Sequence, residues 1–156
     1  MTVKTEDGVK PAQNPILIKH LFTMSAGFDY YLTTKNILQC KEDTSGRCPT
    51  RELMKYLAKD PLEFEPGEAW KYSLSHDVAA AIIEVVSGMS FGEYLKKNIW
   101  EPLHMERTFF AKPMNYLDKL ADQFICEEDA IVPMEPSCCY QLSESYESGG
   151  AGLVSC

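Results

Sequence analysis

Apolar residues recur at helical spacing in several stretches of the chain. The longest such stretch, 75–87, places apolar side chains three or four positions apart, so that they form one stripe that we expect to be buried. Shorter stretches predict helices over 16–24, 51–59 and 91–98, and a further short helix that ends at Leu38. The residues of the predicted buried stripe are Val78, Ala79, Ile82, Ile83 and Val86.

Residues typical of helix ends flank these stretches. Side chains that accept hydrogen bonds from the free amides of a first turn precede each predicted helix. Ser90 and Glu93 have the spacing of a capping box, and Gly88 is expected to end the longest helix. The residues predicted to cap the helix starts are Asn14, Thr33 or Thr34, Thr50, Ser73 or Ser75, and Ser90.

Signals for strands are few. The stretches 121–126 and 130–134 flank three acidic residues and are compatible with a short hairpin, in which Pro133 restricts the second strand to an edge. Residues 1–13 are polar and predict an extended lead-in, whereas 148–156 predicts a glycine-rich turn and the truncated start of a helix. We therefore expect a mainly α fold, one domain over 1–156, with at most a short β-hairpin.

The length and net charge of the chain limit its fold and its possible binding partners. A chain of 156 residues is long enough to bury a sizeable core in one domain. Its formal net charge of −8 argues against nucleic acid and anionic membranes, because both attract a basic surface. No run of 18 apolar residues predicts a membrane span, and residues 1–8 lack the apolar core of a signal peptide.

The six cysteines do not have the pattern of a disulfide framework. Cys138 and Cys139 are adjacent, and Cys156 is the last residue. We expect reduced thiols and favour a cytoplasmic protein. The alternative, under oxidising conditions, is a bridge between Cys40 and Cys48, which flank a polar loop.

Metal and phosphate sites have little support. His20, His76 and His104 are each isolated, with no second histidine three or four positions away, and no Cys-x-x-Cys pair is present. The glycine-rich stretch 148–152 lacks the lysine and spacing of a phosphate-binding loop. We expect no metal and no cofactor.

A complete nucleophile system is not visible in the sequence. Gly88-Met-Ser-Phe-Gly92 matches Gly-x-Ser-x-Gly, but a helix is predicted before it, where a nucleophile elbow needs a strand. The neighbours Ser75, His76 and Asp77 cannot form a triad with one another. Ser25 is expected to make a local contact with the backbone at a helix end, and no serine has a lysine three residues later.

Tyr72 is the candidate that carries the most chemistry. It stands between the Pro66-Gly67 turn and the longest predicted helix, next to the positive end of the helix dipole. A phenol has a reference pKa of about 10 and needs a nearby cation to act as a base near neutrality. Lys71 is adjacent but is expected to point elsewhere in an extended segment. Both a packing role and a chemical role remain open on this reasoning.

Several segments, taken in order, resemble one family. Ile16-Leu-Ile-Lys-His-Leu-Phe-Thr-Met-Ser-Ala-Gly27 is similar to the "ITIRHLLTHTSG" segment of the serine β-lactamase-related hydrolases. That family includes class C β-lactamases, DD-peptidases and related carboxylesterases. Phe64-Glu-Pro-Gly-Glu-Ala-Trp-Lys-Tyr-Ser73 resembles its "F-x-PGE-x-W-x-YSN" segment. Further similar segments are 83–88, 99–109 and 148–155.

The resemblance implies a fold and an incomplete site. It identifies the chain as the helical lobe of the α+β serine β-lactamase and penicillin-binding-protein fold. In the family, a Ser-x-x-Lys nucleophile motif precedes these segments and a Lys-Thr-Gly or His-x-Gly motif follows them; neither is present here. We expect the missing α/β lobe to be a partner, the isolated chain to be inactive, and its uncovered apolar face to promote self-association.

The resemblance also assigns roles to residues. Tyr72 corresponds to the tyrosine that helps to activate the nucleophile and protonates the leaving group of an ester, amide or β-lactam. Leu74 replaces the motif's asparagine, which shifts the expectation from lactam or peptide toward ester, and Ser75 or His76 is left as a substitute for that asparagine. The candidate substrate-binding residues are Leu74, Ser75, Gly149 and Gly150. The alternative function is a non-catalytic helical binding module of the same ancestry.

Overall fold

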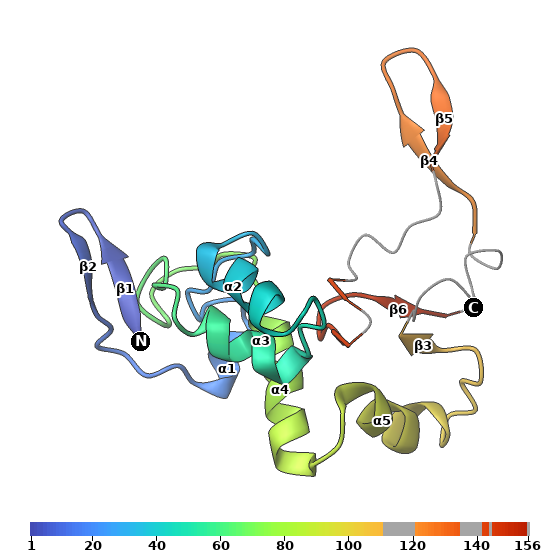
Figure 1. The fold of residues 1–156 in the computed structure, drawn as a ribbon, viewed down its shortest axis with the longest axis horizontal. Coiled ribbons are helices and arrows are strands. Elements are labelled where there is room, and N and C mark those ends of the chain that lie inside the picture. Colours follow the sequence, from blue (N-terminus) through green and yellow to red (C-terminus); the bar gives the residue numbers. More distant parts are fainter. Residues whose placement is uncertain (111–120, 135–141, 144, 156) are drawn as a thin grey trace.

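The computed structural model describes residues 1–110, 121–134, 142–143 and 145–155. Figure 1 shows an elongated arrangement, with a hairpin at the N-terminal end and another, β4–β5, that projects away from the helices. The helices are α1 (Ile18–Phe22), α2 (Lys35–Asp43), α3 (Thr50–Leu57), α4 (Ser75–Ser87), α5 (Phe91–Leu95) and a π-helical turn η1 (Lys96–Trp100). The strands are β1 (Thr2–Thr5), β2 (Gly8–Pro11), β3 (Phe109–Phe110), β4 (Gln123–Cys126), β5 (Ile131–Met134) and β6 (Leu153–Val154).

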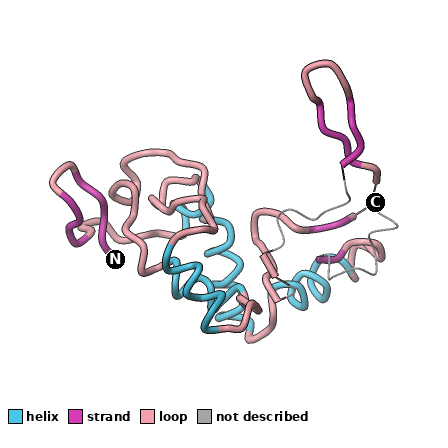
Figure 2. The backbone as a smooth tube through the Cα atoms, turned by 45° about the horizontal axis from the view of Figure 1, so that its top comes forward, coloured by secondary structure: helices cyan, strands magenta, loops and turns pink. Residues whose placement is uncertain are grey.

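The prediction of a mainly α fold with at most one hairpin is wrong. Helices make up 33% and strands about 15% of the described residues. The strands form three separate antiparallel pairs, β1–β2, β3–β6 and β4–β5. Loops connect most elements, as the tube in Figure 2 shows. The helical content is lower than predicted because several segments form hydrogen bonds with the backbone of residues far away in the sequence, and do not continue a helix.

The N-terminal segments illustrate this competition. The lead-in 1–13 is extended, as expected, but it folds into the β1–β2 hairpin, and Lys4 N donates to Leu62 O at 2.8 Å. Asn14 does not cap a helix: its backbone N–H donates to Glu65 at 3.1 Å and its side chain donates to Pro66 O at 3.2 Å. The first helix therefore begins only at Ile18.

The end of the chain also differs from its prediction. Leu153–Val154 forms strand β6 rather than the start of a helix. It pairs with β3, where Phe110 is opposite Leu153 and Phe109 is opposite Val154. Two apolar residues, Leu153 and Val154, are too few to show the periodicity that distinguishes a strand from a helix. The strand with which they pair, β3, lies far away in the sequence.

Two of the predicted caps form and others do not. The Thr34 side chain accepts a hydrogen bond from Ile37 N, and Ser90 with Glu93 forms the predicted capping box. Helix α4 begins after Leu74 without a side-chain cap; the hydroxyls of Ser73 and Ser75 bind each other at 2.8 Å. Thr50 likewise does not cap α3.

Helix α4 has the predicted bounds but only part of the predicted buried face. Gly88 ends it in the left-handed conformation, with φ of 72°. Its buried residues are Ser75, Asp77, Ala80 and Ala81. Val86, from the predicted stripe, is 82% exposed. Val78, Ala79 and Ile83 from the same stripe are half-buried and pack against buried apolar residues. The small residues on the fully buried face allow neighbouring segments to approach closely.

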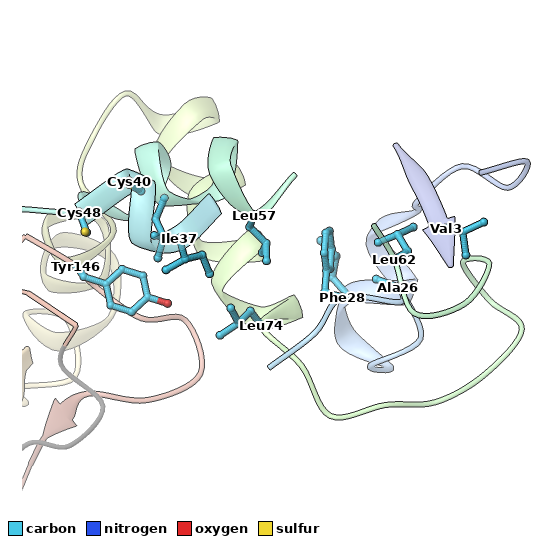
Figure 3. Close-up of a cluster of buried hydrophobic side chains, with 12 residues drawn as sticks. Val3, Ala26, Phe28, Ile37, Cys40, Cys48, Leu57, Leu62, Leu74 and Tyr146 are labelled. Atoms are coloured by element: carbon cyan, nitrogen blue, oxygen red, sulfur yellow. The ribbon is translucent and has the colours of Figure 1, made fainter. Parts of the chain in front are cut away.

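The buried side chains form two clusters. The larger one joins α2, α3, the loops around them and Tyr146, as Figure 3 shows. The smaller one is centred on Phe110, whose ring centroid lies 5.8 Å from that of Phe91 and 6.2 Å from that of Trp100. The larger cluster comprises Val3, Leu21, Ala26, Phe28, Ile37, Cys40, Cys48, Leu53, Leu57, Leu62, Leu74 and Tyr146.

Two cysteines belong to the larger cluster. Cys40 and Cys48 are fully buried free thiols, so the alternative disulfide is not formed in this structure. Burial, followed by the neighbouring Cys48, raises the pKa of the Cys40 thiol to about 11. Cys126, on β4, is a free and exposed thiol.

Among the described residues, no single helix is long and apolar enough to cross a membrane. Helices Ser75–Ser87 and Phe91–Trp100 reach that length and composition only when they are counted together, and they are bent by 76° at their junction.

Candidate functional site

The loop before Tyr72 is fastened to an earlier segment of the chain. Glu63 N donates to Gly27 O at 2.8 Å, Gly67 N to Ser25 O at 2.8 Å, and Lys71 N to Met24 O at 3.0 Å. These bonds join residues 24–27 to residues 63–71 and leave Tyr72 at the end of a fixed segment.

Gly27 makes this close approach feasible. Its φ is +88°, a conformation that side chains disfavour. A Cβ atom there would lie 2.5 Å from Phe64 O, well inside van der Waals contact. The glycine at the end of the "HLFTMSAG" segment is therefore needed for the position of the second, tyrosine-bearing segment.

Tyr72 is half exposed, at 50%, and has an aromatic neighbour. The ring centroids of Tyr30 and Tyr72 lie 5.0 Å apart at an angle of 55°, a tilted arrangement that aromatic pairs prefer. Lys71 does point elsewhere, as predicted: its Nζ lies 3.2 Å from both Asp29 Oδ1 and Glu63 Oε2. Burial lowers the pKa of Lys71, but the bonds to these carboxylates outweigh it and raise the pKa.

A cavity of about 620 Å³ lies beside Tyr72. Its wall is built from three parts of the chain: the loop after α1, the start of α4 and the glycine-rich turn. Among the described lining residues there is no lysine or arginine. The lining residues are Met24, Tyr30, Tyr31, Leu32, Thr33, Tyr72, Ser73, Leu74, His76, Asp77, Tyr146, Ser148, Gly150 and Ala151.

Asp77 is the buried charged group of this wall. Its Oδ1 accepts hydrogen bonds from the Tyr146 hydroxyl at 2.5 Å and from the Ser148 hydroxyl at 2.6 Å. Burial, followed by the charge of Asp77, raises the pKa of Tyr146 far above its ordinary value. Tyr146 therefore stays protonated as a hydrogen-bond donor and is unsuited to act as a base.

The glycine-rich turn lies directly against the start of α4. Ser148 Oγ accepts from Gly150 N and Ala151 N, both at 3.1 Å. A Cβ atom on Gly149 would lie 2.1 Å from His76 O and 3.0 Å from the Ala80 side chain. Only glycine fits at this position without displacing the turn.

Glu147 ties the same segment to two further helices. Its backbone N–H donates to Thr50 Oγ1 at 2.7 Å, and its carbonyl accepts from that hydroxyl at 2.9 Å. Its carboxylate accepts from Gly92 N, in the first turn of α5, at 2.6 Å. This pairing explains why Thr50 is buried yet does not cap its own helix.

The structure brings together only some of the predicted site residues. Tyr72, Leu74 and Gly150 line the cavity. Ser75 is fully buried and bound to Ser73, and Gly149 is packed on the backbone of α4, so neither contributes to the described lining. His76, the other substitute considered for the motif asparagine, does line the cavity.

The sequence did not predict that Tyr146 and Ser148 both bind Asp77. Asp77 was considered only as a neighbour of Ser75 and His76, and its partners lie 69 and 71 residues later. Its presence in the first turn of a helix is explained equally well by the helix dipole. No periodic signal connects the three residues.

Metal ligands do not gather in the part of the chain that is described: no group of three or more histidine, cysteine, aspartate or glutamate side chains there is placed to hold a metal ion.

Comparison with known families decides the assignment. The β-lactamase family model matches residues 7–156. The chain belongs to the β-lactamase family. The resemblance of the sequence segments is thereby confirmed over nearly the whole chain.

The chain is similar to two esterases and to one solved hydrolase structure. The chain is 31% identical over 103 residues to lovastatin esterase of Penicillium rubens, covering 64% of this chain and 25% of that protein. It is 27% identical over 169 residues to esterase EstB of Burkholderia gladioli, covering 94% of this chain and 42% of EstB. The structure of EstCE1, a hydrolase with promiscuous acyltransferase activity, matches 99% of this chain and 45% of that one, with a TM-score of 0.73 and 26% identity.

The chain spans less than half the length of each of these three proteins.

The contacts around α5 predict a pH-dependent change in stability. Burial and the nearby charge of Glu147 raise the pKa of Glu84, although its carboxylate accepts from Phe91 N at 3.1 Å. A raised folded-state pKa means that ionised Glu84 destabilises the fold above that pKa, and that the cost disappears as the pH falls through it. Glu84→Gln should therefore be more stable than the wild type at pH 7.

Urea unfolding at pH 7 and pH 4 measures this difference. The advantage of Glu84→Gln should shrink at pH 4, where the wild-type carboxyl is largely protonated. Glu101→Gln, at an exposed position, is the control and should change little at either pH. An equal advantage for Glu84→Gln at both pH values would contradict the electrostatic explanation.

Proposed function

We propose that this chain is one part of a β-lactamase-family serine hydrolase that acts on neutral esters through an acyl-enzyme. The observation that carries the proposal is the half-exposed Tyr72 beside a cavity of about 620 Å³. In this proposal residues 1–156 form a single domain that supplies the tyrosine and one wall of the site. The serine and lysine of a Ser-x-x-Lys motif come from sequence outside these 156 residues.

Of the four described tyrosines that line the cavity, Tyr72 and Tyr146 have different environments, and this difference supports the assignment to Tyr72. The hydroxyl of Tyr146 is committed to Asp77. Tyr72 instead packs its ring on Tyr30 and is half exposed. A general acid or base must come within hydrogen-bond reach of the reacting atoms, and an exposed phenol is able to do so. We assign Tyr72 to proton transfer with the nucleophile and the leaving group.

The lining favours an ester without a carboxylate. The described lining includes the carboxylate of Asp77, whose charge repels anions. Leu74, which stands where the family's motif has an asparagine, lines the cavity but is only 4% exposed, so the small surface that it offers to a substrate is apolar. Gly150 lines the same cavity and completes the proposed substrate-binding surface.

Exposed apolar residues support a missing partner lobe. Helices α1 and α4 contact each other, and both present large apolar side chains to solvent. Exposed apolar surface of this extent is typical of interaction sites. We propose that the remaining α/β part of the same protein covers these side chains: Ile18 and Phe22 on α1, and Ile82, Val85 and Val86 on α4.

The isolated chain should lack hydrolase activity. Neither p-nitrophenyl butyrate nor a chromogenic cephalosporin should be hydrolysed above the buffer rate, because an acyl-enzyme needs an activated nucleophile. Intact-mass spectrometry after incubation should show no acyl adduct on serine. A stoichiometric serine adduct would refute the division of the site.

Tyr72→Phe should inactivate the longer protein that contains this chain. Proton transfer by a positioned side chain contributes roughly 10²–10⁴-fold, so kcat for p-nitrophenyl butyrate should fall by at least about 10²-fold. Tyr94→Phe, on α5 and outside the described cavity lining, is the matched control and should retain activity. Equal activity of both variants would exclude Tyr72. A longer protein without Ser-x-x-Lys and without esterase activity would instead favour a non-catalytic binding module.

The isolated chain should self-associate through the uncovered faces of α1 and α4. Light scattering coupled to size exclusion should show a mass that increases with concentration. Val86→Glu should reduce this association, whereas Val9→Glu, exposed on β2, should leave it unchanged. A monomer at all concentrations up to about 0.5 mM would contradict a large uncovered face.

A further inference from the structure

We propose that Asp77 is the positioning residue of the candidate site and fixes the turn Ser148–Ala151 as a wall of the cavity. The catalytic consequence rests on the proposed function, whereas the structural consequence does not. Asp77 is 3% exposed, and its Oδ1 binds two hydroxyls that the chain brings from 69 and 71 residues away.

The direction of each hydrogen bond determines the geometry of the turn. A carboxylate only accepts hydrogen bonds, and a serine hydroxyl has one hydrogen to donate. Because Ser148 donates that hydrogen to Asp77, its lone pairs are left to accept from Gly150 N and Ala151 N. Asp77 therefore sets the orientation of the Ser148 hydroxyl, and the hydroxyl sets the path of the next three residues.

The alternative explanation for Asp77 is a favourable charge in the first turn of α4, which contributes about 0.3–1 kcal/mol at exposed positions. That explanation requires no distant partner. Here the carboxylate is buried and spans from the helix to the 146–148 segment. Hydrogen bonds to a charged group are the stronger ones, so they outweigh the dipole.

The fit of the turn against α4 shows why its path matters. Gly149 lies so close to His76 O that no side chain fits, and the next residues, Gly150 and Ala151, line the cavity. Without Asp77, the turn would lose its hydrogen bond from α4 to Ser148 and would keep only the van der Waals contact of Gly149 with the helix. The turn would then move away from the cavity that Tyr72 also lines.

Hydrogen exchange measured by NMR on the 156-residue chain tests the structural part. In Asp77→Ala, the Gly150 and Ala151 amides should exchange about tenfold faster or more, as expected for the loss of a hydrogen bond to a charged group. Asp77→Asn should retain most of the protection, because its amide oxygen can accept from both hydroxyls. The amide of Lys4, which donates to Leu62 O at the β1–β2 hairpin, should be unchanged.

Three results would overturn the proposal. These are unchanged exchange at Gly150 and Ala151 in Asp77→Ala, equal acceleration at Lys4, and failure of Asp77→Asn to restore protection. Ser148→Ala removes the acceptor but keeps the bond between Asp77 and Tyr146. It should accelerate the same two amides, and it provides the test if Asp77→Ala does not fold.

The catalytic part is tested in the longer protein with p-nitrophenyl butyrate. Asp77→Ala should lower kcat/KM by about tenfold or more and Asp77→Asn by much less, because the turn and not the charge is required. Equal losses in both variants would contradict positioning. If the wild-type protein shows no esterase activity, the proposed function fails, while the exchange experiment still decides the role of Asp77.

Discussion

The three-residue segment Tyr146–Ser148 depends on polar contacts with three helices. The Tyr146 and Ser148 side chains bind Asp77 on α4, the Glu147 backbone binds Thr50 on α3, and the Glu147 carboxylate binds Gly92 on α5. All three residues of the segment are buried. A buried polar group without a partner costs roughly 1–3 kcal/mol, so these contacts are interdependent. The cavity wall is thus a product of helix packing and not of a local loop conformation.

The family resemblance could be recognised from the sequence because each similar segment is a short, contiguous stretch of residues. The bounds of α4, the Ser90–Glu93 capping box and the β4–β5 hairpin follow from short-range signals, and all three are present. The position of Tyr72 before α4 follows from the same kind of signal. Family membership is shown over residues 7–156.

The parts that were wrong depend on distant partners. Thr50 has the residue type and position of a cap, but its hydroxyl is used by Glu147, 97 residues later. The β3–β6 pair joins two-residue strands that show no periodicity of their own. The predicted stripe of α4 is only partly buried, at Val78, Ala79 and Ile83. The fully buried face instead contains the small Ala80 and Ala81, where neighbouring segments approach closely. Val85 and Val86 are apolar residues of a type usually found in a core, yet no described segment of this chain covers them.

The glycine-rich turn has a consequence for protein engineering. Position 149 is closed to substitution, since any side chain would overlap the backbone of α4. Position 150 is open, because a Cβ there would meet its nearest atoms only at 3.7–3.9 Å, ordinary van der Waals distances. A library that keeps Gly149 and varies Gly150 and Ala151 would therefore reshape the cavity wall while leaving its attachment intact. New substrate preferences are to be sought at those two adjacent positions.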